Sequence, residues 1–426
     1  MSERESVAEG GIRASWSLLR RNRDFRRLYL ASVISLGGDW FLLVPLWALV
    51  LELTGSPLYV ALSFAAMDVP FFLVSPFAGA LVDRLDRRKL MVLCDVVRAV
   101  LCLGFLLIRD ESTVWIMFPV LAALTSFSAV FDPASSAALP NLVEERDLPT
   151  ANALSGSLWG TMLAIGSAAG GLVAAAVGRD AAFLIDAASF AASAILIFRI
   201  RRALAEERHE EHAGVIEATA ETVRYARRDH RVLALLAVKF GFGLGAGGLL
   251  VLIPVFATDV FHGGDGTLGL LMSARGIGAL VGPFLGRRML GPRDRQLFTV
   301  IGLALATFGL GYAFLGLATS IAVAMPLIAM AHLGGGAQWT TSSYGLQRIV
   351  PDRIRGRIFA FDNALITFTF TISGLVSGYV AERAGPRPTA IALGLVALAF
   401  AVGWTLATTD VRRATLIEGC AEPEAA

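Results

Sequence analysis

Apolar segments of about twenty residues recur along almost the whole chain, and charged residues gather in the short stretches between them. An α-helix of that length crosses the hydrocarbon core of a bilayer, which is about 30 Å thick, at about 1.5 Å per residue. The pattern therefore predicts an all-α integral membrane protein with about twelve transmembrane helices. The predicted spans lie near 27–51, 57–82, 89–108, 113–138, 149–178, 181–200, 231–258, 267–287, 297–317, 320–345, 357–382 and 388–409.

Composition agrees with a bilayer environment. The chain has 55% hydrophobic residues, 17% charged residues and a mean hydropathy of +0.65, whereas soluble domains average about 45–50% apolar and about 25% charged residues. The net charge of +2 is small, and its pattern follows membrane topology, so we expect lipid as a partner and no nucleic acid. Cys94, Cys102 and Cys420 do not form a disulfide framework.

Basic residues mark every second connection between the predicted spans. Because Lys and Arg near a span are retained on the cytoplasmic side, both termini are predicted to be cytoplasmic, in the inner (cytoplasmic) membrane. Arg109, Arg179, Arg383 and Arg387 are the exceptions on the other side. The polar N-terminus has no cleavable signal pattern, so the first span is expected to serve as an uncleaved signal.

An internal repeat divides the chain into two halves. "PNLVEERDLPTANAL" begins at Pro140 and "PDRIRGRIFAFDNAL" at Pro351, 211 positions later, and both follow a span that begins outside. Pro45 in "LVPLW" and Pro254 in "LIPVF" lie 209 positions apart. Parallel repeats of this kind are common in transporters.

The repeat predicts five regions. They are a cytoplasmic N-terminal segment 1–26, a six-helix bundle 27–200, a cytoplasmic linker 201–230 with an interfacial helix, a second six-helix bundle 231–409 and a cytoplasmic tail 410–426. The linker's "HEEH" at 209–212 is interpreted as a solvated turn, because two histidines without further ligands rarely hold a metal.

The stretch "GALVDRLDRRKL" from Gly79 to Leu90 resembles the signature of the major facilitator superfamily between its second and third spans. Asp86 stands where the family usually has Gly. A weaker copy, "GPRDRQ", places Asp294 opposite Asp83. The wider text, including "VFDPASSAALPNLVEERDLPTANALSG", is most similar to the siderophore and macrolide exporter branch. The resemblance implies two pseudo-symmetric six-helix bundles and secondary transport by alternating access.

The signature also predicts a conformational latch on the cytoplasmic side. Its arginines would donate to carboxylates on adjoining helices in one state and release them in the other; the alternative is that these residues only enforce topology. Asp95 and Arg98 are expected to pair with each other or with the latch. The predicted latch residues are Gly79, Asp83, Arg84, Arg87, Arg88, Asp95, Arg98 and Asp294.

Charged residues inside spans are costly and tend to mark transport pathways. The candidates for proton coupling or the cavity are Asp39, Asp68, Asp132, Arg275 and His332. Asp39 is the first candidate for carrying a proton, because desolvation favours the protonated form of a carboxylate, and Asp68 is the second. The alternative for each is a fixed partner of a basic group. Lys239 is interpreted either as reaching the inner surface or as contacting an anionic substrate.

The fifth span is rich in glycine. Gly156, Gly160, Gly166 and Gly170 include four-residue spacings that let helices pack closely. In antiporters of the superfamily, a Gly-Pro-x-x-Gly motif in this span is associated with export, and the matching residues here are Gly166, Gly170 and Gly171. Ser167 replaces the motif's proline.

The leading hypothesis is proton-coupled efflux of a small amphipathic molecule by a monomer, without a metal or cofactor. The only lysines are Lys89 and Lys239, and neither belongs to a P-loop, so an ion gradient must drive the transport. An importer or an uncoupled facilitator is the near alternative, and a channel or receptor on the same scaffold is a further one. An enzyme is not favoured, because His332 is the only histidine within a span and lacks a catalytic pattern around it.

Overall fold

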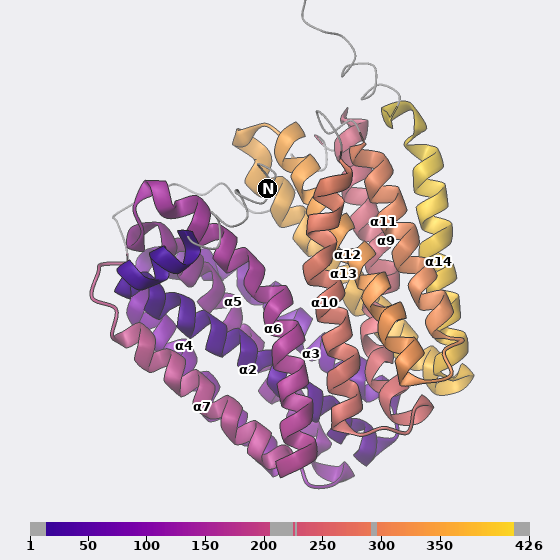
Figure 1. The fold of residues 1–426 in the computed structure, drawn as a ribbon. Helices are drawn as coiled ribbons and strands as arrows, with labels where there is room; N and C mark the ends of the chain where they lie inside the picture. The colour runs from indigo at the N-terminus through magenta and orange to yellow at the C-terminus, as the bar shows by residue number, and fades with distance from the viewer. Residues whose placement is uncertain (1–13, 205–224, 226–227, 291–295, 413–426) are drawn as a thin grey trace, which may run out of the picture. The chain divides into compact units, whose positions relative to one another are not determined.

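The structure is a computed structural model that describes residues 14–204, 225, 228–290 and 296–412 (Figure 1). Within this part of the chain the regular structure is entirely helical, and twelve segments are long and apolar enough to span a membrane. The prediction of an all-α membrane protein with about twelve spans is therefore confirmed. The interfacial helix predicted for the linker lies outside the described residues.

The first half consists of six predicted spans and three short helical turns. In chain order these elements are α2 (Arg23–Thr54), α3 (Pro57–Arg84), α4 (Arg87–Cys102), the 3-10 turns η1 (Leu103–Leu107) and η2 (Glu111–Ile116), α5 (Met117–Leu142), the 3-10 turn η3 (Glu145–Asp147), α6 (Leu148–Val177) and α7 (Arg179–Phe198).

The second half repeats this order of six spans. Its elements are α9 (His230–Val255), the π-helical turn η4 (Phe256–Val260), α10 (Asp265–Met289), α11 (Leu297–Leu315), α12 (Ile321–Ile349), α13 (Asp352–Ala384) and α14 (Pro386–Ala407).

The chain divides into two compact units. Unit 1 comprises the chain up to Thr54 and from Ala66 to Glu210, and unit 2 comprises Gly55–Ala65 and the chain from Glu211 onwards. The first turns of α3 therefore belong to unit 2, whereas the repeat had assigned the whole helix to the first bundle.

The same tight turn connects the last two spans of each half. Gly178 ends α6 and begins α7 with a φ of 103°, and Gly385 ends α13 and begins α14 with a φ of 88°. A side chain at such a φ is strained, so glycine is the natural residue for a one-residue connection between two helices. This shared turn is a structural counterpart of the repeat found in the sequence.

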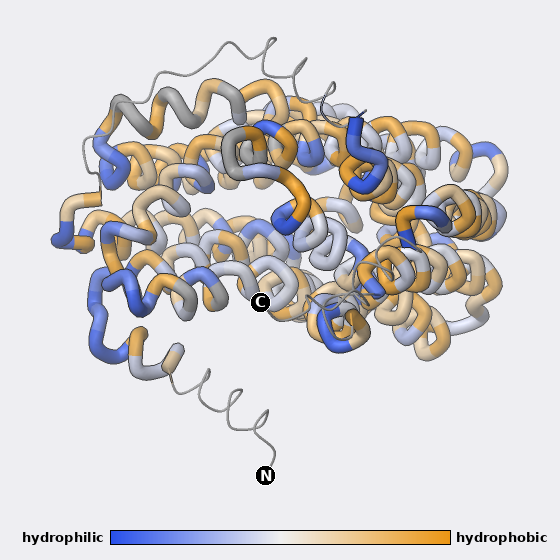
Figure 2. The backbone as a smooth tube through the Cα atoms, turned by 90° about the horizontal axis from the view of Figure 1, so that it is seen from above, coloured by the Kyte–Doolittle hydropathy of each residue, from blue (hydrophilic) through white to orange (hydrophobic). Residues whose placement is uncertain are grey.

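The helices turn apolar faces outward. Figure 2 shows hydrophobic colour along most helices and hydrophilic colour mainly at their ends and connections. On α4, Leu93, Val96 and Val100 are 55%, 47% and 64% exposed at helical spacing. An apolar stripe of this kind is stable when it faces lipid.

Glycines allow several helices to pack backbone to backbone. In unit 2, a Cβ added at Gly278 or Gly282 of α10 would collide with the main chain of α12, and one at Gly336 of α12 would approach the main chain of α10. In unit 1, a Cβ at Gly166 or Gly170 of α6 would collide with the main chain of α2. The glycines of the fifth span thus serve close helix packing.

We predict opposite effects of the same substitution at two glycines of α6. Gly170→Ala should lower stability by about 1–3 kcal/mol, because its new methyl group would overlap the Phe41 backbone. Gly156 has no atom within 4 Å of its added Cβ, so Gly156→Ala should be neutral or stabilise by up to about 1 kcal/mol. Thermal unfolding of both variants in detergent checks this. An unchanged melting temperature for Gly170→Ala would contradict the packing.

Candidate functional site

A buried ion pair lies on one face of α4. Asp95 and Arg98 are three residues apart, which places them on the same side of the helix, and they form a salt bridge while 0% and 1% exposed. The Arg98 guanidinium also donates to Ser128 Oγ at 3.2 Å. It lies over the rings of Phe131 and Phe190, at 4.6 and 4.4 Å from their centroids. These contacts offset part of the cost of burying the cation.

Three further carboxylates lie within electrostatic range of Arg98. Asp39 on α2, Asp132 on α5 and Asp186 on α7 each interact electrostatically with the guanidinium. We call Asp39, Asp95, Arg98, Asp132 and Asp186 the aspartate–arginine cluster. Sequence reasoning singled out Asp39 and Asp132 separately, and unit 1 brings them together around one cation.

Asp186 joins the cluster through a glycine on α2. Its carboxylate accepts hydrogen bonds from the Cys102 thiol at 3.1 Å and the Ser189 hydroxyl at 3.2 Å. A Cβ at Gly38 would collide with that carboxylate, so only glycine lets α7 approach α2 at this level. The sequence analysis did not single out Asp186. The available signal was Gly38 directly before Asp39.

The four carboxylates differ in their access to solvent. Asp95 and Asp186 are fully buried, whereas Asp39 is half-buried and Asp132 is exposed. One arginine compensates only one of four negative charges. The arrangement therefore gathers four acidic side chains near a single buried cation, two of them at less buried positions of unit 1.

An aromatic pair adjoins Asp39. Trp40 on α2 and Trp159 on α6 meet edge to face with their ring centroids 5.8 Å apart, and Trp159 is 46% exposed. An exposed indole can contact both the apolar and the polar part of an amphipathic molecule, because its ring is apolar and its N–H donates a hydrogen bond.

Unit 2 contains a second buried ion pair. Lys239 on α9 pairs with Asp362 on α13, with both residues at most 3% exposed. The ammonium group also donates to Ser343 Oγ at 2.9 Å and lies 4.5 Å from the Trp339 ring centroid. Lys239 thus has a fixed partner within its own unit. Sequence reasoning missed Asp362, although it is an acid inside the predicted span 357–382.

Arg275 and His332 lie in another polar group of unit 2. His332 Nε2 and the Tyr312 hydroxyl are hydrogen-bonded at 2.5 Å, and the imidazole meets the Phe308 ring edge to face. Arg275 interacts electrostatically with both Tyr312 and His332. All three side chains are buried, and the hydrogen bond to Tyr312 directs His332 towards α11.

The turn before α4 is held by main-chain contacts. Asp86 caps α4 by accepting from the Lys89 backbone N–H at 3.0 Å, which explains an aspartate where the signature usually has glycine. Arg87 donates to the carbonyls of Ala137 and Leu204 at 3.0 and 2.9 Å, and Arg88 donates to that of Arg202 at 2.8 Å. These arginines thus bind carbonyls in place of the expected carboxylates.

The remaining predicted residues are placed as follows. Asp68 is half-buried on the part of α3 in unit 1, and Gly171 is buried on α6. Gly79, Asp83 and Arg84 belong to α3, but their side chains lie outside the described residues, and so does the whole of Asp294.

Comparison with known proteins decides the family. Residues 13–416 match the transmembrane secretion effector family of the major facilitator superfamily, which is nearly the whole chain. The chain belongs to this family. The resemblance seen in the sequence is confirmed, and the protein is a transporter of the major facilitator type, not an enzyme.

Relatives and fold neighbours agree with membership of the superfamily. The multidrug efflux pump Tap of Mycolicibacterium fortuitum is 26% identical over 88% of this chain and 93% of its own length. The uncharacterized MFS-type transporter YfiS of Bacillus subtilis is also 26% identical, over 56% of this chain and 59% of its length. The crystal structure of the nucleoside transporter NupG superposes with a TM-score of 0.71 at 12% identity, over 91% of this chain and 99% of that one.

We predict that the Lys239–Asp362 pair is mutually dependent. Lys239→Met or Asp362→Leu alone should cost about 3–5 kcal/mol, because each leaves a buried charge uncompensated. The double variant should recover most of that loss, because an apolar pair of similar size replaces the ion pair.

The exposed pair Arg109–Asp180 is the matched control. Its side chains are 58% and 53% exposed, so Arg109→Met should cost about 1 kcal/mol or less. Thermal unfolding of the four variants is the measurement. A double variant of Lys239 and Asp362 as unstable as the sum of its singles would rule out the coupling.

Proposed function

We propose that this transporter exports a small amphipathic molecule in exchange for protons by alternating access. The observation that carries the proposal is the aspartate–arginine cluster, in which four carboxylates share one cation and two of them, Asp39 and Asp132, are less buried than the others. Buried acids of this kind in transporters commonly take part in proton relays.

Asp39 is assigned the carrier role in this proposal. It is half-buried, beside the close contact between Gly38 and Asp186, and it interacts with Arg98 and with the other three carboxylates. A change in its protonation therefore alters the charge balance of the whole cluster. Arg98 tunes the acids without releasing a proton, because a guanidinium stays charged. One proton moving down 100 mV supplies about 2.3 kcal/mol.

The direction and substrate class rest on two supports. A relative that shares nearly its whole length with this chain is named as a multidrug efflux pump. In addition, Trp40 follows Asp39 on α2 and its ring meets that of the exposed Trp159, an aromatic surface that suits a molecule with an aromatic or apolar body and a polar group. A siderophore-like or drug-like compound has this chemistry.

The membrane arrangement is part of the same proposal. We assign a monomer in the inner membrane. Both termini are placed in the cytoplasm, because arginines cluster where α2 begins and between the end of α3 and the start of α4. The signature from Gly79 to Leu90 then lies on the cytoplasmic side, where a latch that opens and closes with the transport cycle would act.

We predict that Asp39→Asn abolishes uphill export. In inverted vesicles loaded with a proton gradient, the wild type should accumulate a fluorescent amphipathic dye, and a protonophore should stop it. Asp39→Asn should lose at least about tenfold of the accumulation, because one proton moving down 100 mV supplies about 2.3 kcal/mol and the amide cannot carry it, while downhill dye exchange persists. Asp180→Asn is the matched control, because Asp180 is an exposed aspartate paired with Arg109.

Two outcomes would refute this assignment. Full uphill transport by Asp39→Asn with an unchanged pH dependence would exclude Asp39 as the carrier. Dye flux in the wild type that never exceeds its gradient, with or without a protonophore, would identify an uncoupled facilitator.

We also predict the sidedness of two connections. In a Cys420→Ser background, the remaining Cys94 and Cys102 are buried. Labelling with a maleimide therefore detects only the introduced cysteines. Glu111→Cys should react with an impermeant maleimide on intact cells, whereas Glu145→Cys should react only after the membrane is opened. Both positions are exposed, and the reverse labelling pattern would invert the proposed topology.

A further inference from the structure

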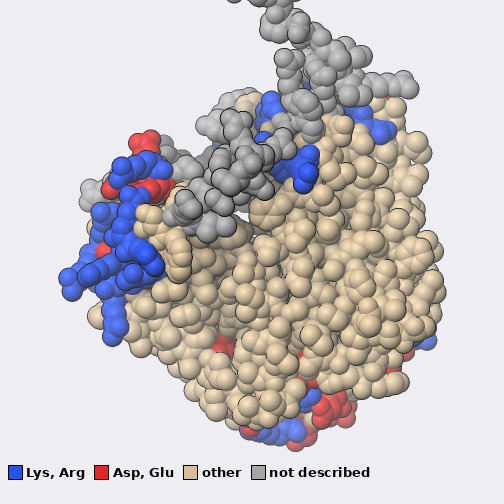
Figure 3. Space-filling model, in the orientation of Figure 1, with Lys and Arg blue, Asp and Glu red and all other residues tan. Residues whose placement is uncertain are grey.

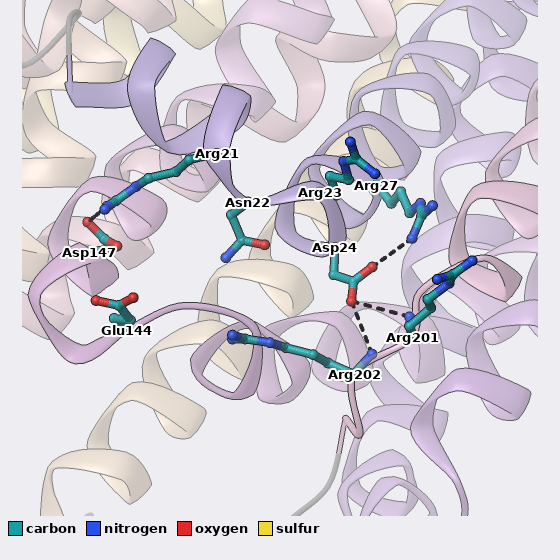
Figure 4. Close-up of a pocket in the computed structure, with 9 residues that line it drawn as sticks. All are labelled: Arg21, Asn22, Arg23, Asp24, Arg27, Glu144, Asp147, Arg201 and Arg202. Carbon is teal, nitrogen blue, oxygen red and sulfur yellow. Dashed lines mark hydrogen bonds and ion pairs between the residues drawn. The ribbon is translucent and has the colours of Figure 1, made fainter.

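A basic pocket opens at the end of unit 1 where α2 begins (Figure 4). Its volume is about 450 Å³. Five arginines line it: Arg21, Arg23 and Arg27 from the start of α2 and the segment before it, and Arg201 and Arg202 from the segment after α7. Figure 3 shows Lys and Arg side chains gathered densely on this unit.

The acids of the pocket already have partners. Asp147 pairs with Arg21, and Glu144 pairs with Arg146 at 2.8 Å. Asp24 pairs with Arg27 at 2.7 Å.

Asp24 also orders the opposite wall of the pocket. It accepts hydrogen bonds from the backbone N–H groups of Arg201 and Arg202, at 3.3 and 3.1 Å. Within the described part of the chain, the side chains of Arg23 and Arg201 pair with no carboxylate. Asp24 and Asp147 therefore hold the pocket together, and the two guanidinium groups stay available.

A second hollow of about 640 Å³ continues from the first and shares Arg27 and Arg201 with it. Arg88 and Arg199 add two more cations, and Phe198 and Ile200 add apolar surface. Together the two hollows present seven arginines and three carboxylates, which leaves four positive charges uncompensated.

The apolar side of the second hollow leads onto the outer face of α7. Phe198, the last residue of that helix, is 71% exposed. Ile195 and Leu184 on the same helix are 53% and 50% exposed. The surface thus changes from basic to apolar over a few residues at the end of a membrane-spanning helix.

We propose that this surface binds an anionic phospholipid, with its phosphate in the basic pocket and its acyl chains along α7. Guanidinium groups bind phosphate oxygens in a forked geometry, and basic pockets among transmembrane helices suit acidic lipid headgroups. The exposed Phe198 face distinguishes a lipid from a free phosphate ion. Four excess charges favour a lipid with two phosphates, and a zwitterionic headgroup would bring an ammonium group that the arginines repel.

The test is native mass spectrometry of the full-length protein in a mixture of diphosphatidylglycerol and phosphatidylethanolamine. The wild type is expected to retain diphosphatidylglycerol preferentially. Arg23→Gln/Arg201→Gln should reduce that preference about tenfold or more, because each arginine near a lipid surface contributes favourably to binding. The control Arg109→Gln/Arg383→Gln removes two charges elsewhere, at a salt bridge and over the Tyr379 ring, and should keep the preference.

Three further measurements test whether a lipid occupies this surface. Thermal unfolding without added anionic lipid should show that the double variant is folded. Raising salt should release lipid from the wild type, since the headgroup is held electrostatically. Phe198→Gln should weaken retention of the lipid but not binding of inorganic phosphate.

The proposal fails on either of two results. One is equal retention of diphosphatidylglycerol by the arginine variant, the control and the wild type. The other is displacement of the lipid by millimolar inorganic phosphate together with no effect of Phe198→Gln, which would identify a site for a soluble anion. Neither result depends on the direction or coupling of transport.

Discussion

The packing of unit 1 around its buried charges depends on the contacts of the Arg98 guanidinium. A cation inside a membrane protein is tolerated only where its surroundings replace water, and here Asp95, Ser128 and two aromatic rings do so. Once Arg98 is in place, further acids on α2, α5 and α7 can lie near it at a lower electrostatic cost. The cation therefore makes the acidic cluster possible, and in the proposed function this cluster supplies the protonatable groups.

Much of this architecture was predictable from the sequence because its causes are local. Span length and hydropathy depend on neighbouring residues, and the three-residue spacing of Asp95 and Arg98 is a property of one helix. The partners of Asp39 and Lys239 could not be predicted from local sequence. Asp186 reaches Asp39 only because Gly38 lets α7 approach, and Asp362 meets Lys239 from a segment 123 positions away. Such pairs depend on which helices adjoin and how each is rotated, which hydropathy does not encode.

The arginines at the basic end of unit 1 have more than one role. Residues that orient a chain during membrane insertion also bind main-chain carbonyls in the folded protein, as Arg87 and Arg88 do. Asp86 also has a structural role. It departs from the family signature, and its side chain caps α4. These residues therefore have a third role, besides setting topology or forming a latch. Carbonyl contacts fix the helix ends, while Arg23 and Arg201 remain available to ligands.

The glycine contacts between α10 and α12 have a mechanical consequence. Where Gly278, Gly282 and Gly336 meet the opposing main chain, there is no room for a side chain between the two backbones. The distance between the helix axes is therefore set by main-chain contact, and a larger residue at any of the three positions would push the helices apart. The spacing of two helices in unit 2 thus depends on three residues that lack a side chain.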